Sequence, residues 1–136
     1  MKTFIICLGI NLVATFCFAQ QHHVVLIYYP PTQLGTSCYD AVMTKESFNS
    51  LTDAIEHERK LFKENKSSSI SVYRIRQNEI GIIYEWKIQS GNKLCTKIAV
   101  VIGTDESQAM KVLEKQRASK TNVNIIGYLN TAGTQK

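Results

Sequence analysis

The residues from Ile80 to Gln89 form two interleaved sets of side chains, and this pattern constrains the fold more than any other. The first set is Ile80, Ile82, Tyr84, Trp86 and Ile88, and it alternates with Gly81, Ile83, Glu85, Lys87 and Gln89. A two-residue period is that of a β-strand with one buried face. A second apolar run at 94–102 follows a polar turn, so the two segments predict a long antiparallel hairpin.

The register of this hairpin depends on the length of its loop. A two-residue loop sets Trp86 opposite Lys97, whereas a three-residue loop sets Tyr84 opposite Ile98 and Glu85 opposite Lys97. The longer loop gathers apolar partners on one face and pairs opposite charges across the strands. We therefore expect the three-residue loop, with Tyr84 and Trp86 in the core beneath the helices.

The rest of the chain predicts two helices and three further strands, with a loop at 32–43. An amphipathic stripe predicts a helix over 45–64, and a capping residue followed by a weaker stripe predicts another over 105–117. The order βαβββαβ predicts an α+β fold: a two-layer sandwich, with two helices on one face of a mainly antiparallel sheet, as in ferredoxin-like folds. The predicted strands are 24–29, 70–77, 80–89, 94–102 and 123–129.

A short internal similarity links the two predicted helices. The sequence SLTDAI at 50–55 and the sequence DESQAM at 105–110 each stand where a helix precedes a strand. The similarity suggests that a helix-then-strand unit occurs twice.

The first nineteen residues have the pattern of a secretory signal peptide. Lys2 supplies a cation, an apolar run occupies 4–18, and Ala19 is a small residue at the expected cleavage site. The apolar run is short for a membrane span, which needs about twenty residues. We expect a secreted or periplasmic protein with a single domain over 20–130 and a flexible tail over 131–136.

Two of the four cysteines, Cys7 and Cys17, lie within the expected signal peptide. Cys38 and Cys95 are then left together in an oxidising compartment, where paired cysteines form disulfides. We predict a Cys38–Cys95 disulfide, which the chain-entropy model values at about 4 kcal/mol.

Charge and composition indicate solubility and disfavour nucleic acid, and we expect a protein or envelope component as the partner. The formal net charge is +5, but the cations are dispersed, without the basic run or aromatic-basic motif of nucleic-acid binders. The predicted open sheet face and the loop over 30–39 are the expected partner surfaces, and the sheet face is also the expected contact surface of a homodimer. The residues of this sheet face are Ile83, Lys87, Lys97, Ala99 and Val101.

The chemistry-bearing residues do not assemble into a known catalytic or metal motif. The three histidines could serve a small metal-independent hydrolase as general acid and base, which is one alternative. His22 would also stand third from the new amino terminus after cleavage, a position that can bind Cu(II). Without a serine elbow, paired carboxylates or a phosphate loop, we expect a binding or accessory domain without catalysis, cofactor or metal.

One further pattern spans the first predicted strand of the hairpin, its loop and the start of the next strand. Its residues are Gln77, Asn78, Glu79, Ile80, Gly81, Tyr84, Gly91, Cys95, Thr96 and Lys97. This pattern resembles the inhibitory strand-loop-strand region of cystatins. The resemblance implies a secreted inhibitor that inserts the loop at 77–81 into the cleft of a papain-like cysteine protease, with Leu34 and Gly35 as the N-terminal contact.

Overall fold

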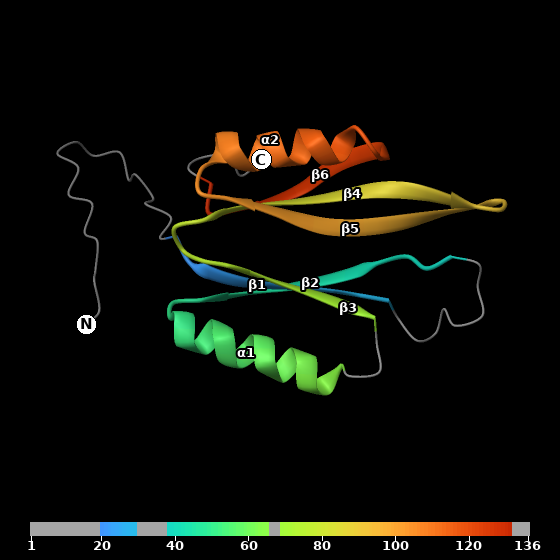
Figure 1. Ribbon diagram of the computed structural model, residues 1–136. Helices are drawn as coiled ribbons and strands as arrows, with labels where there is room; N and C mark the ends of the chain where they lie inside the picture. The colour runs from blue at the N-terminus through green and yellow to red at the C-terminus, as the bar shows by residue number, and fades with distance from the viewer. Residues whose placement is uncertain (1–19, 30–37, 66–68, 132–136) are drawn as a thin grey trace, which may run out of the picture.

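The computed structural model describes residues 20–29, 38–65 and 69–131, which fold into four layers in the order helix, sheet, sheet, helix (Figure 1). This confirms the α+β class. Within these ranges the strands are β1 His22–Tyr28, β2 Val42–Phe48, β3 Ile70–Ile75, β4 Ile80–Ser90, β5 Lys93–Gly103 and β6 Thr121–Leu129, and the helices are α1 Leu51–Glu64 and α2 Glu106–Arg117.

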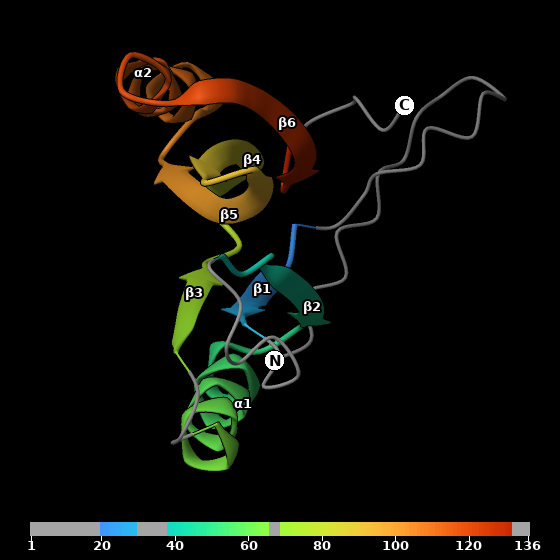
Figure 2. The same cartoon turned by 90° about the vertical axis from the view of Figure 1, so that its right-hand side faces the viewer.

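Two antiparallel sheets form, instead of the one that the sequence predicts. Sheet A has the strand order β2-β1-β3, and sheet B has the order β5-β4-β6. The sheets face each other, α1 covers the outer face of sheet A, and α2 covers the outer face of sheet B (Figure 2). The helices therefore lie on opposite sides of the molecule, not on one face of a two-layer sandwich.

Strand β2 is the element that the sequence analysis missed. It occupies Val42–Phe48, which the sequence predicts as the end of a loop and the beginning of the first helix. Its central residues Thr44, Lys45, Glu46 and Ser47 are all exposed, because β2 is an edge strand. Such a strand lacks the apolar alternation by which strands are recognised.

The chain consists of two units with the same β-β-α-β order and the same strand arrangement. The internal similarity marks equivalent helix starts: Ser50 caps α1 by accepting from Asp53 N at 3.2 Å, and Asp105 caps α2 by accepting from Gln108 N at 2.8 Å. Ala54 and Ala109 then face the two sheets and are fully buried. A small residue at this position lets each helix approach its sheet closely.

The β4–β5 hairpin has the register that the sequence analysis rejected. Tyr84 pairs with Ala99 and Trp86 with Lys97, so the loop has two residues. Gly91 is the first of them and has a φ of 60°. Glycine with positive φ at this position suits the type II′ hairpin turn, whose twist matches that of the strands.

The expected register rested on the assumption that only one face of sheet B is buried. In fact both faces are covered. Ile83 and Val100 pack in the core between the two sheets, whereas Tyr84 and Val101 pack against α2. Apolar pairs on either face are therefore compatible with burial, and the turn at Gly91 determines the register.

Candidate functional site

The β4–β5 hairpin extends beyond the rest of both sheets, as Figure 1 shows. We call residues 88–94 the hairpin tip. Two large apolar side chains stand in the tip, Ile88 with 42% of its surface exposed and Leu94 with 61%. Gln89 Nε2 donates to Gly91 O at 2.9 Å and fixes the turn between them. The tip thus presents apolar side chains on an ordered turn.

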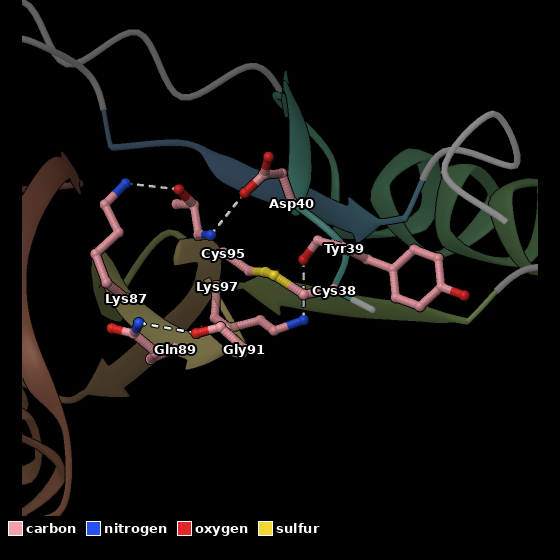
Figure 3. Close-up of a disulfide and its surroundings, with 9 residues drawn as sticks. Cys38, Tyr39, Asp40, Lys87, Gln89, Gly91, Cys95 and Lys97 are labelled. Atoms are coloured by element: carbon pink, nitrogen blue, oxygen red, sulfur yellow. Dashed lines mark hydrogen bonds between the residues drawn. A yellow bond between two sulfur atoms is a disulfide. The ribbon is translucent and has the colours of Figure 1, made fainter. Parts of the chain in front are cut away.

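A disulfide joins this hairpin to the segment that leads into β2 of sheet A (Figure 3). Cys38 is bonded to Cys95 as predicted, and the two Cα atoms lie 5.9 Å apart. Next to the disulfide, Asp40 Oδ1 accepts from Thr96 N at 2.7 Å and Ala41 N donates to Thr96 O at 2.8 Å. The chain that leads into β2 therefore pairs with the outer edge of β5 and braces the hairpin below its tip.

Two lysines lie near this brace. Lys87 Nζ donates to Thr96 Oγ1 at 2.6 Å, and Lys97 Nζ donates to Tyr39 O at 3.0 Å (Figure 3). Lys97 Nζ also lies 4.3 Å from the ring centroid of Tyr29, in a cation–π contact. Both ammonium groups are thereby held in place without a carboxylate partner in these contacts.

The sequence of the hairpin is basic over its whole outer part. Residues 86–104 contain Lys87, Lys93 and Lys97 and no aspartate or glutamate. Lys93 is exposed in the tip. The tip therefore combines exposed apolar surface with positive charge.

The five residues predicted as a partner surface do not share an open face. Ile83 is 1% exposed and lies between the sheets, whereas Ala99 and Val101 pack beneath α2. Lys87 and Lys97 are half-buried in the brace. The sheet face was expected to be open because sheet A was not anticipated, and in the structure that face is covered. Residues 30–37 of the loop expected as a partner surface lie outside the described residues.

The exposed tip residues were not singled out from the sequence. Ile88 and Leu94 look like ordinary members of two apolar strands, and only the length of the hairpin relative to its neighbours leaves them uncovered. Their position on either side of a glycine turn is the one signal that could have identified them.

The segment that resembles cystatins connects the two sheets. Residues 76–79 form a turn in which Glu79 N donates to Arg76 O at 3.0 Å, and Gly81 already pairs with Ile102 and Leu129 inside sheet B. The segment therefore connects β3 of sheet A to β4 of sheet B and does not close a hairpin within one sheet. Leu34 and Gly35 lie outside the described residues.

The histidines are distributed over the molecule. His22 is buried in β1, and its Nδ1 accepts from Gln77 N at 3.3 Å, so this nitrogen is already engaged and is not open to a Cu(II) ion. His57 packs on Phe48 and lies 3.7 Å from Glu46 Oε1. Among the described residues, no three His, Cys, Asp or Glu side chains are grouped as metal ligands would be, and no helix is long and apolar enough to cross a membrane.

Comparisons of the chain with protein families, with curated proteins and with solved structures find no match. Function must therefore be argued from the geometry of the chain itself.

Proposed function

We propose that the protein is an exported binding domain that contacts a partner protein through the hairpin tip and performs no chemistry there. The observation that carries the proposal is the exposure of Ile88 and Leu94 at the end of a projecting hairpin. Ile88 pairs with Cys95 and Leu94 with Gln89, so the two apolar side chains project from opposite faces of the tip. Exposed apolar side chains on an ordered surface are typical of protein interaction sites.

The brace supports this function. A loop that is already ordered loses less conformational entropy on binding than a flexible one. The Cys38–Cys95 disulfide and the Thr96 backbone pairs hold the hairpin just below the tip, so its shape is set before a partner arrives.

Charge indicates the chemistry of the partner. The brace holds the carboxylate of Asp40, but the three lysines and the absence of carboxylates over 86–104 still leave positive charge in excess and favour an acidic surface. Complementary charge speeds association and fixes orientation. The partner is therefore a protein with an apolar pocket and an acidic rim. A disulfide is compatible with an extracellular location, and the signal-peptide pattern over 1–19 supports an encounter outside the cytoplasm.

The test is capture of the partner from the extracellular fraction of the producing cell by matched immobilised variants. Wild type and Val112→Ser, which alters an exposed apolar residue on α2, should capture the same polypeptide. Ile88→Ser and Leu94→Ser should lose it, and the wild-type capture should weaken as salt is raised. Equal capture by all four proteins, or capture by none, overturns the proposal.

A further inference from the structure

At the other end of the molecule from the hairpin tip, one asparagine joins the two halves of the chain. Asn130 follows β6 with a φ of 61°. Its Nδ2 donates to the backbone oxygens of Gln21 at 2.8 Å, Arg76 at 3.0 Å and Glu79 at 3.1 Å. Its Oδ1 accepts from Gln21 N at 3.0 Å. These partners fix which side-chain atom is the oxygen.

The fixed amide of Asn130 determines the tautomer of His23. His23 Nε2 lies 3.0 Å from Asn130 Oδ1, and because Oδ1 can only accept, Nε2 carries the proton. In neutral imidazole the other nitrogen is then an acceptor. His23 Nδ1 lies 2.9 Å from Ser47 Oγ, so the Ser47 hydroxyl donates to it.

The charge state of His23 suits a general base. Burial lowers the pKa of His23 below 6.5, and the charges of Lys45 and His22 lower it further, against the raising effect of the hydrogen bond to Asn130. At neutral pH the ring is therefore uncharged and Nδ1 can take a proton. A hydroxyl bonded to a base, which is itself oriented by a third group, is the arrangement of an activated nucleophile.

The fold does not require polar residues at the positions of His23 and Ser47. His23 and Ser47 are cross-strand partners, one pair from the end of the β1–β2 ladder. The equivalent pair of the second half is Gly81 opposite Ile102. The second half thus forms the same ladder with no hydroxyl and no imidazole.

We propose that Ser47, His23 and Asn130 form an acyl-transfer site for carboxylic esters. Ser47 is exposed on an edge strand and can be reached by substrate. The side-chain amides of Gln21 and Asn49, joined at 2.9 Å, end the same two strands and offer N–H donors to a developing oxyanion. The exposed Lys45 favours an anionic acyl group.

The reaction has two steps. Ser47 Oγ attacks the carbonyl carbon while its proton moves to His23 Nδ1; the bond from carbon to the alcohol oxygen breaks, and the alcohol leaves with that proton. Water then attacks the acyl carbon, giving one proton to Nδ1, which returns it to Ser47 Oγ as the carboxylic acid leaves. Asn130 holds the imidazole and is a positioning residue.

The experiment uses the purified disulfide-bonded protein and a fluorophosphonate probe, whose fluoride the serine oxygen displaces. Intact mass and peptide mapping should find one label, on Ser47. Ser47→Ala should not be labelled, His23→Gln should be labelled about 100-fold more slowly, and Ser71→Ala, which alters an exposed serine on the edge strand β3, should match wild type.

The pH dependence of wild type makes the test independent of folding in the variants. The labelling rate should rise with pH through the pKa of His23, measured by NMR on the same sample. Absence of label on folded wild type, label on another residue, or a rate that ignores the His23 pKa overturns the proposal. None of these variants alters the hairpin tip, so the labelling result neither supports nor contradicts the binding proposal.

Discussion

Ser47 Oγ lies 2.9 Å from His23 Nδ1, across the pair formed by the edge strand β2 and the central strand β1. The contact holds the imidazole in one tautomer, because Asn130 engages its other nitrogen at 3.0 Å. The pKa of His23 therefore depends on the folded structure, and this pKa can be measured.

We predict that His23 titrates below 6.5 in the folded protein, since burial disfavours its charged form. Lys45→Ala should raise the pKa by removing a nearby positive charge. The measurement is the pH dependence of the histidine ring signals by NMR, with Lys63→Ala in the last turn of α1 as the control that leaves the pKa unchanged. A His23 pKa at or above 6.5 contradicts the structure of this end of the molecule.

The same shift makes stability depend on pH. The unfolded chain binds a proton on His23 at about 6.5, and the folded chain binds it only at lower pH. The stabilising contribution is thus fully present above 6.5 and is lost as pH falls below 6.5 towards the folded pKa. Urea unfolding from pH 7.5 to 5 should show a smaller decrease for His23→Gln than for wild type, whereas equal decreases would exclude His23 as the cause.

The sequence predicted the elements that are rich in apolar residues or whose ends are capped. Helix α2 begins at Glu106 after its Asp105 cap, as expected, and the Cys38–Cys95 disulfide forms. Helix α1 ends at Glu64 as expected but begins at Leu51, six residues after the predicted start at Lys45. The polar edge strand β2 extends to Phe48 and takes up the first part of the predicted helix. Its sequence has no apolar periodicity that would predict a strand.

Local sequence patterns do not predict either candidate site. The hairpin tip depends on how far β4 and β5 extend past the other strands, and the Ser47 site joins three residues from β1, β2 and the end of β6. Such arrangements follow from the pairing of two sheets. The polar strand β2 gave no sign of a second sheet, so the pairing of the two sheets could not be derived from the sequence.

Removal of the disulfide should destabilise the protein substantially. The bond closes a loop across a sequence separation of 57, for which chain entropy predicts about 4 kcal/mol. The double variant Cys38→Ser, Cys95→Ser should show this loss in urea unfolding, together with faster amide exchange at Thr96. A loss below about 1 kcal/mol would show that the brace does not depend on the bond.

Replacing Gly103 or Gly91 with alanine should destabilise the protein, for a different reason in each case. At Gly103 a methyl group would lie 2.6 Å from Ala109 N, so Gly103→Ala should cost about 3 kcal/mol by forcing α2 from sheet B. Gly91 has open space but a φ of 60°, so Gly91→Ala should cost about 1 kcal/mol. Thermal unfolding measures the loss of stability in each variant. A larger loss for Gly91→Ala than for Gly103→Ala would contradict the packing of α2 against sheet B.

Papain-like proteases should not be inhibited at micromolar protein. Gly81 is buried between Ile75 and Leu129 and belongs to sheet B, so the segment at 77–81 is not a free hairpin loop. The measurement is titration of papain with a fluorogenic substrate. Tight inhibition that Gly81→Ala abolishes, while Leu94→Ser retains it, would establish the cystatin-like alternative.

The central claim is that the hairpin tip binds the partner. Its most direct test is the dissociation constant of the purified captured partner for wild type, Leu94→Ser and Val112→Ser. A buried anchor residue is worth about 2 kcal/mol, so Leu94→Ser should bind about 30-fold more weakly, and Val112→Ser should bind as wild type does. Equal affinity of Leu94→Ser and wild type would contradict the account.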